Sequence, residues 1–248
     1  MKYFTKDWYE LCQKTSFHLL LEEDPQAQHF SEEYFQQLYN AELHRWLDTQ
    51  EEIHHCLVTE YGHKETFDRD KEKEQFHDVL LYNLAHFKRG LPETILNQIA
   101  DLRVFALNKA SRDVLDAVTK FCEENDRIID KVSGDFRKYY QEASKSISKE
   151  IVENFAFHDC IVIKVVQNGN SLTLHLDTSG GFTDINEITF ENMNILKQDD
   201  VLEEAWWLYE EVYKVEDKYE FHVLLQNKNM ELIDFIISAD RFTFLRGH

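Results

Sequence analysis

The sequence contains few of the residues that interrupt regular structure or crosslink a chain. Its 248 residues include 7 glycines and 2 prolines, against 43% hydrophobic residues, so the composition predicts an ordered, compact chain with short loops. The four cysteines lie far apart and form no CxxC pair, which argues against a zinc knuckle and against a disulfide framework. Reduced thiols are typical of the cytoplasm, and we expect a cytoplasmic location.

Basic residues and long apolar runs are also scarce. The chain has 27 Lys and Arg residues against 47 Asp and Glu residues, a formal net charge of −20, which repels phosphate backbones and anionic lipids. We therefore expect no nucleic-acid partner and no membrane partner, whereas a protein partner with a basic surface fits the charge. No apolar run approaches the roughly 20 residues of a membrane-spanning helix, and the charges among the first fifteen residues predict no targeting segment.

The first part of the chain shows the periodicity of helices. Ser31, followed by two glutamates, is typical of a helix N-cap, and the apolar spacing after it predicts one long helix that ends at Gly62. A second helix is expected over 70–87, and the helical pattern continues over 92–106. The longest repeat of apolar residues at spacings of three and four runs over 111–143 and is typical of a helical bundle.

Near residue 150 the period changes from helical to alternating, and β-branched and aromatic residues become frequent. The segment Asn168-Gly169-Asn170 indicates a hairpin, because Asn and Gly tolerate the positive φ of tight turns. The expected strands are 160–166, 171–177, 187–196, 206–215, 219–226, 230–238 and 241–245. The sequence therefore predicts an α+β protein, with an N-terminal all-helical bundle over 1–150 and a C-terminal antiparallel β-meander or sandwich-like domain over 151–248.

Four Glu-x-x-His pairs in the helical part raise the possibility of a metal centre. Residues three apart share a helix face, so a carboxylate and an imidazole can bind one ion, as in di-iron carboxylate bundles. The best candidate set is Glu52, His55, Glu74 and His77; the other pairs are Glu51 with His54 and Glu60 with His63. Because glutamate is abundant in this stretch, four pairs are only a mild excess over chance. We expect no cofactor and an exposed polar helix face.

A second arrangement resembles the metal-dependent HD phosphohydrolases, which use a His-Asp pair on a helix with an upstream histidine and a downstream carboxylate to activate water. The matching residues are His77 and Asp78, with His54 or His55 upstream and Asp113 or Asp116 downstream. The dipeptide is followed by Val79-Leu80-Leu81, where that family has small or basic residues, and the upstream spacing is short. This departure favours a solvated helix edge.

The segment before the first expected strand carries residues with catalytic potential. His158 and Asp159 could orient a proton transfer, and Cys160 beside them is a possible nucleophile. A cysteine at the head of an apolar strand is more often a small buried hydrophobe. An Asp at a domain junction more often caps backbone amides. The sequence therefore favours structural roles here.

The strand expected over 206–215 is the strongest candidate for partner binding. It is rich in aromatic residues, which supply much of the affinity at protein interfaces, and it lies in a half of the chain with 18 acidic and 7 basic residues. The candidate contact residues are Trp207, Tyr209, Glu211 and Tyr213. Acidic side chains would guide a basic partner toward these aromatic residues.

Several motifs resemble known families. The opening MKYFTKDWY and the segment WWLYEEVYKVEDKYEFHVLLQ resemble a domain-of-unknown-function family of Gram-positive bacteria along the full chain. The segments FHDCIVIKV and NGNSLTLHLD are similar to β domains of bacterial toxin-immunity-type proteins. Neither resemblance implies a catalytic residue.

The sequence features together favour a non-enzymatic, acidic protein-binding protein, immunity-like or regulatory. The alternative function is that of a metal-dependent helical-bundle enzyme, of the di-iron carboxylate or HD phosphohydrolase type. It would use the Glu/His-rich helices.

Overall fold

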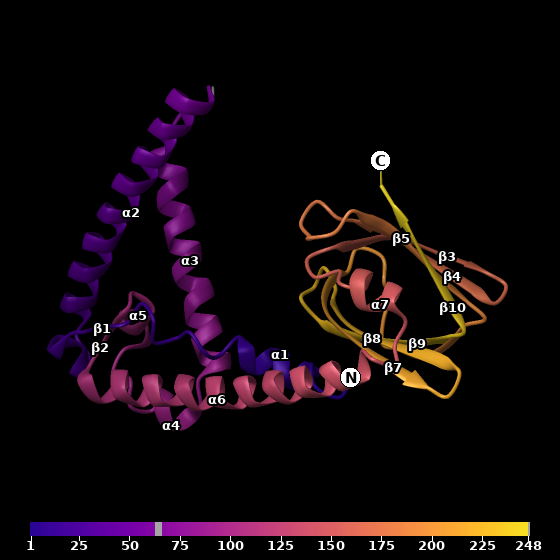
Figure 1. The fold of residues 1–248 in the computed structure, drawn as a ribbon. Helices are drawn as coiled ribbons and strands as arrows, with labels where there is room; N and C mark the ends of the chain where they lie inside the picture. Colours follow the sequence, from indigo (N-terminus) through magenta and orange to yellow (C-terminus); the bar gives the residue numbers. More distant parts are fainter. Residues whose placement is uncertain (63–65, 248) are drawn as a thin grey trace. The chain divides into compact units, whose positions relative to one another are not determined.

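The computed structural model describes residues 1–62 and 66–247, with helices preceding strands along the chain (Figure 1). The long helices are α2 (Glu32–Tyr61), α3 (Arg69–Gly90) and α6 (Arg112–Ala143), and an eight-stranded antiparallel sheet follows. This order confirms the predicted α+β class. No helix in the described ranges is long and apolar enough to cross a membrane.

The chain divides into two compact units. One is formed by residues 13–126, and the other combines residues 1–12 with residues 127 onward. The division falls within α6, and it joins the N-terminal segment to the β-rich part of the chain. The division into a helical bundle domain over 1–150 and an antiparallel β domain over 151–248 stays a prediction.

Local capping signals define the first long helix of the helical unit. The Ser31 side chain accepts a hydrogen bond from the Tyr34 backbone N–H at 3.2 Å, and Glu32 and Glu33 occupy the first turn, where the helix dipole favours negative charge. Gly62 ends α2 in the left-handed conformation, with φ of 69°, which glycine adopts without steric cost. Both predicted helix boundaries are confirmed.

The expected helical run over 92–106 is interrupted. Two short helices, α4 (Glu93–Leu96) and α5 (Leu102–Ala106), replace it, because Asp101 caps a new helix start by accepting the Arg103 backbone N–H at 2.9 Å. Val104, Phe105 and Ala106 of α5 are buried, and they pack with side chains of α2, α3 and α6 in one core. That core includes Phe35, Phe76, Leu80, Phe87, Phe105, Val118 and Cys122.

Short elements complete the helical unit and the N-terminal segment. The two-residue strands β1 (Glu22–Glu23) and β2 (Lys109–Ala110) pair in parallel. The 3-10 helix η1 (Pro25–Gln28) follows β1, and α1 (Lys6–Cys12) belongs to the β-rich unit.

The sheet of the β-rich unit has the order β10-β5-β4-β3-β7-β8-β9-β6. Its strands are β3 (Ile161–Asn168), β4 (Ser171–Asp177), β5 (Ile185–Glu191), β6 (Asn194–Gln198), β7 (Trp206–Val215), β8 (Lys218–Gln226), β9 (Leu232–Ala239) and β10 (Arg241–Arg246). The two central strands, β3 and β7, share one registered pair, Ile161 and Trp206, and backbone hydrogen bonds between residues 159–162 and 204–207 flank it. The sheet therefore consists of two four-stranded halves joined over a short stretch, as in a sandwich.

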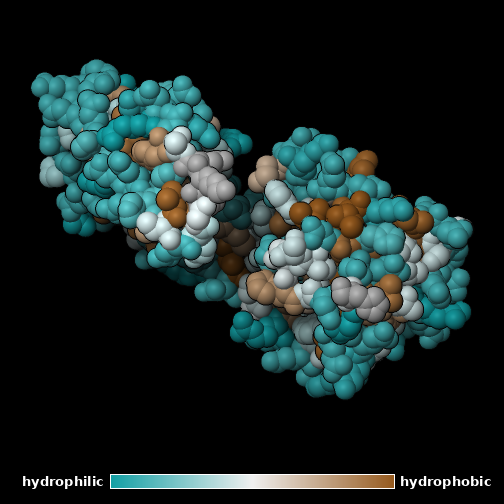
Figure 2. All heavy atoms as spheres, turned by 90° about the horizontal axis from the view of Figure 1, so that it is seen from above, coloured by the Kyte–Doolittle hydropathy of each residue, from teal (hydrophilic) through white to brown (hydrophobic). Residues whose placement is uncertain are grey.

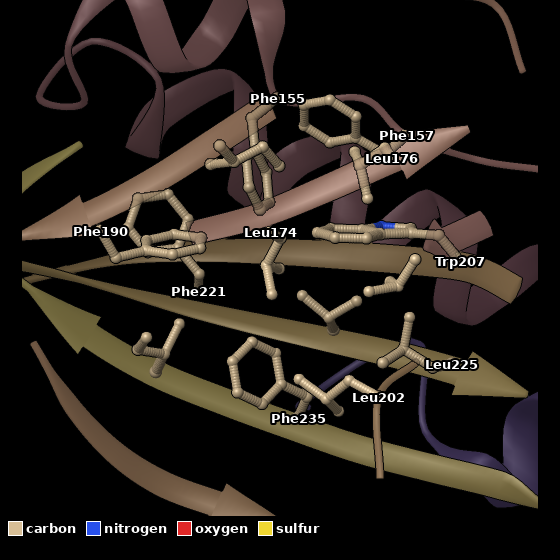
Figure 3. Packing of buried hydrophobic residues seen from close by; sticks show 14 of the residues in the cluster. Phe155, Phe157, Leu174, Leu176, Phe190, Leu202, Trp207, Phe221, Leu225 and Phe235 are labelled. Carbon is tan, nitrogen blue, oxygen red and sulfur yellow. The ribbon is translucent and has the colours of Figure 1, made fainter. Parts of the chain in front are cut away.

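Aromatic side chains fill the space between the two halves (Figure 3). Phe190 of β5 packs on Phe221 of β8 with ring centroids 5.0 Å apart. Phe155 and Phe157, which follow α7 (Lys149–Asn154), both contact the Trp207 ring, at 5.7 and 5.1 Å. Burial of each such ring contributes about 2–3 kcal/mol. These contacts fix the two halves face to face.

The prediction of one strand over 187–196 is wrong, because two strands occupy this stretch. Its first part is β5, which pairs with β4 and β10, whereas its second part is β6, which pairs with β9 in the other half of the sheet. Asn192 between them has a φ of 49°, a left-handed conformation that interrupts extended backbone. The chain therefore crosses from one half of the sheet to the other at this position.

The N-terminal segment is held on β7 by a buried carboxylate. Glu211 is 1% exposed, and its side chain accepts the backbone N–H groups of Lys2, Tyr3 and Phe4 at 2.7, 2.8 and 2.6 Å. The Tyr213 hydroxyl donates to the same carboxylate. Four donors replace the water that this buried charge has lost.

We expect Glu211→Ala to lower the free energy of unfolding of the β-rich unit by about 2–4 kcal/mol, because removal of the carboxylate leaves buried donors without an acceptor. The loss of unfolding free energy is limited because the N-terminal segment can detach, so that its N–H groups donate to water instead. Urea unfolding followed by circular dichroism and tryptophan fluorescence measures it.

The control is Lys214→Ala, an exposed position on the same strand, for which a change within about 0.5 kcal/mol is expected. Equal effects of the two substitutions would contradict the anchoring role of Glu211.

Candidate binding site

The residues predicted for partner binding on β7 lie in internal contacts. Trp207 is fully buried in the core between the sheet halves, and Glu211 is occupied by the N-terminal segment. On the same face as Glu211, Tyr209 packs against Phe4 and Trp8, at 5.2 and 4.9 Å between ring centroids. Their placement gives no support to the predicted binding role.

Tyr213 is covered in the same way. Its ring lies 5.5 Å from that of Tyr139 in α6, and burial together with the Glu211 contact raises the pKa of its hydroxyl. The alternation of β7 correctly separates two faces, and over residues 207–213 both faces are covered by other parts of the chain.

A cluster of ionisable groups lies where β7 meets the segment before β3. Glu210 accepts the Trp207 indole N–H at 2.6 Å, and burial raises the pKa of its carboxyl group to about 7, against the opposing effect of that hydrogen bond. The His158 ring contacts the Leu208 carbonyl oxygen. Sequence reasoning missed Glu210, because alternation alone does not show that a carboxylate faces a core.

The Cys160 thiol next to this cluster is not activated. Burial, followed by the nearby charges of Glu210 and Asp159, raises the pKa of the thiol to about 11. Gly181 lies so close that a side chain there would meet the sulfur atom. A protonated, enclosed thiol is a poor nucleophile, so the structural role favoured from sequence agrees with this geometry.

The residues predicted for metal binding do not converge. Among the residues that the structure describes, no three His, Cys, Asp or Glu side chains are placed to hold a metal ion. The set Glu52, His55, Glu74 and His77 is not gathered into such a group, and neither are the described histidines and aspartates of the phosphohydrolase-like arrangement. His63 of the fourth pair lies outside the described residues.

The helical unit instead contains a groove between α2 and α3. Figure 1 shows these helices close together near the end of α2 and separated toward α5. The groove has a volume of about 320 Å³, within the range of ligand sites. Apolar side chains form much of its lining: Trp46, Phe76, Val79, Leu80, Ala106 and Leu107.

Polar side chains complete the lining of this groove. They are Glu42, Arg45, Thr49, Gln50, Asn83 and Asn108. Arg45 is paired with Glu42 at 3.0 Å, and the Trp46 indole N–H donates to Glu72 at 3.3 Å. An apolar lining with few charges suits the burial of an apolar surface of a ligand.

The distal half of α2, residues 48–61, has no buried side chain. Ile53, Val58 and Tyr61 are 47, 40 and 75% exposed. The face that Figure 2 shows is largely hydrophilic, with hydrophobic residues gathered at a patch on the β-rich unit and at smaller spots on the helical unit. Within the distal half of α2, only Gln50, His54 and Leu57 are half-buried. This half of the helix therefore gains less from packing, which supplies most of the stability of helices in proteins.

The sequence profile of a family described as Protein of unknown function (DUF4085) matches residues 29–236. The chain belongs to this family. The prediction of a domain-of-unknown-function family is thereby confirmed. No curated protein and no solved structure matches the chain.

The DUF4085 match includes all of α2, α3 and α6, and therefore the whole lining of the groove. It does not include residues 1–28, so the N-terminal segment that binds Glu211 lies outside it. The groove is thus a feature of the family region.

We expect Glu210→Gln to stabilise the protein, relative to the parent, more at pH 8 than at pH 5. Well below pH 4.5 the Glu210 carboxyl is neutral in both the folded and the unfolded chain. As the pH rises to about 7, the unfolded chain ionises first, so the folded state loses stability. The shift corresponds to about 3 kcal/mol, which the neutral glutamine removes.

Urea unfolding of the variant and the parent at both pH values measures this difference. Glu216→Gln, in the exposed turn after β7, controls for the loss of one carboxylate. A gain that is the same at pH 5 and pH 8 would show that Glu210 does not titrate in this range.

We also expect the fastest-reacting thiol to be Cys56, which is exposed on α2, whereas Cys12 is half-buried and Cys122 and Cys160 are buried with raised pKa values. Reaction with Ellman's reagent at pH 8 should lose its fast phase in Cys56→Ser and keep it in Cys160→Ser. The opposite result would restore Cys160 as a candidate nucleophile.

Proposed function

We propose that this protein is a non-enzymatic binding protein. Its acidic helix α2 binds a basic surface of a protein partner. One observation carries the proposal: residues 48–61 form a helix without a buried side chain, and this helix presents carboxylates beside exposed apolar residues. Immunity-like and regulatory proteins would act through such binding. A cytoplasmic location is part of the proposal, since none of the four cysteines forms a disulfide.

The charge of α2 supports a basic partner. The helix has seven acidic residues and one basic residue, Arg45, which is already paired with Glu42. Carboxylates on one surface raise the association rate with a basic partner, whereas buried apolar contacts supply most of the affinity. Ile53 and Tyr61 are exposed and available for such contacts.

The proposal locates binding on α2, where the sequence favoured β7. The reason is occupancy: Tyr209 and Tyr213 pack against other parts of their own unit, whereas the distal half of α2 has no buried side chain and leaves Ile53, Val58 and Tyr61 exposed. An enzymatic function receives less support, because the Cys160 thiol is enclosed and the predicted metal ligands lie apart among the described residues.

Photo-crosslinking in cells that naturally express the protein tests this proposal. A photoreactive amino acid at position 53 should capture one partner, whose crosslinked peptide is identified by mass spectrometry and carries net positive charge. Changing Asp48 and Glu52 together to Lys should lower the yield about tenfold, because it reverses the local field that attracts the partner.

The matched control places the same photoreactive residue at Phe182, a 91% exposed hydrophobic residue of the β-rich unit. Capture at position 182 with none at position 53 would contradict the proposal. So would a crosslinked segment with net negative charge.

A further inference from the structure

The lining of the groove follows helical periodicity on both of its sides. The α3 residues are Phe76, Val79, Leu80 and Asn83, spaced i, i+3, i+4 and i+7. The α2 residues are Glu42, Arg45, Trp46, Thr49 and Gln50, spaced i, i+3, i+4, i+7 and i+8. Each helix therefore contributes one longitudinal stripe, and the two stripes face a common space.

A third helix can pack between two helical stripes that flank an open groove. An amphipathic helix places its own i, i+3, i+4 and i+7 residues into such a groove, and the result is the packing of a helical bundle. The α2 stripe continues past the groove to Ile53, which follows Gln50 by three residues and is 47% exposed. From Glu42 to Ile53 the stripe is about three turns long.

The charge of α2 beside the groove indicates which kind of helix would bind there. Beyond Arg45, α2 carries Asp48, Glu51, Glu52 and Glu60 and no Lys or Arg, and of these carboxylates Glu51 is paired with Arg69 of α3 at 3.5 Å. Arg45 itself is paired with Glu42. A bound helix that flanks its apolar stripe with Lys or Arg would meet these carboxylates, whereas an acidic helix would be repelled.

The geometry points to a basic amphipathic helix of the partner protein as the occupant of the groove between α2 and α3. This inference rests on the proposed function, and it names the segment that the partner supplies. A second copy of this chain fits less well, because each copy carries a net charge of −20 and would repel the other at close range.

The test uses the full-length protein and a designed peptide probe of about five helical turns, with leucines on one face and lysines on the flanks. Two comparison peptides have the same composition in scrambled order, or glutamate in place of lysine. Fluorescence anisotropy measures their dissociation constants at low and at physiological salt. We expect the basic amphipathic peptide to bind at least about tenfold more tightly than either comparison peptide, and more weakly as salt rises.

Two pairs of variants locate the probe. Val79 lines the groove and is 37% exposed, whereas Leu81 is 50% exposed and lies outside the lining of the groove. We expect Val79→Glu to weaken binding about tenfold or more, because a charge would be buried against leucine, and Leu81→Glu to change it less than about twofold.

The second pair separates local charge from net charge. Glu52 lies one turn beyond Thr49 of the groove, and Glu124 is an exposed residue of α6. Both Glu52→Lys and Glu124→Lys change the net charge equally, and only Glu52→Lys is expected to weaken binding, by about threefold at low salt. Circular dichroism of all four variants verifies that their helices are retained.

Each result decides for or against the inference. Binding that survives Val79→Glu, or equal binding of the ordered and scrambled basic peptides, would show that acidic α2 attracts basic chains without a helix in the groove. This outcome would overturn the inference and leave the proposed function standing. Absence of binding by all three peptides, or binding of the acidic one, would also overturn the inference. The proposed function is tested separately: it would be rejected if the photoreactive residue at position 53 captured no partner.

Discussion

The buried carboxylate of Glu211 determines which segments belong to the β-rich unit, because it binds the N-terminal segment to the sheet. A charge that is 1% exposed is stable only when donors surround it, and three of the four donors come from backbone more than 200 residues earlier in the chain. The segment held in this way lays Tyr3 and Phe4 against Phe136 of α6, at 5.5 and 4.4 Å between ring centroids. Residues 1–12 and the second part of α6 therefore belong with the sheet, and the division between the units falls inside a helix.

The same contact decides what β7 can do. One face of this strand packs Trp207 into the space between the sheet halves, and the other is covered by the N-terminal segment and α6. An aromatic-rich strand covered on both faces contributes stability to the unit, whereas a binding surface must remain exposed until a partner arrives. The exposed apolar residues of α2 meet that condition.

Local chemistry made much of the fold predictable. Ser31 and Gly62 bound α2 because a hydroxyl cap and a left-handed glycine are properties of single residues, and the strand expected over 171–177 matches β4. Features set by distant contacts were not predictable. Alternation places Glu211 on one face of β7, yet it does not say which segment covers that face. The groove likewise depends on the separation of α2 from α3, which the spacing of residues within each helix does not specify.

The distribution of charge on α2 opposes its own folding. Asp48 stands three residues before Glu51 and four before Glu52, and like charges at these spacings each destabilise a helix by about 0.2–0.5 kcal/mol. The same stretch gains less from packing than the buried first half of α2, since none of its side chains is fully buried. A helix with these properties belongs to the less stable part of a protein. A basic helix bound in the groove would neutralise the repulsion and cover Ile53 at once, so the features that weaken α2 in the free protein are those that would favour the complex.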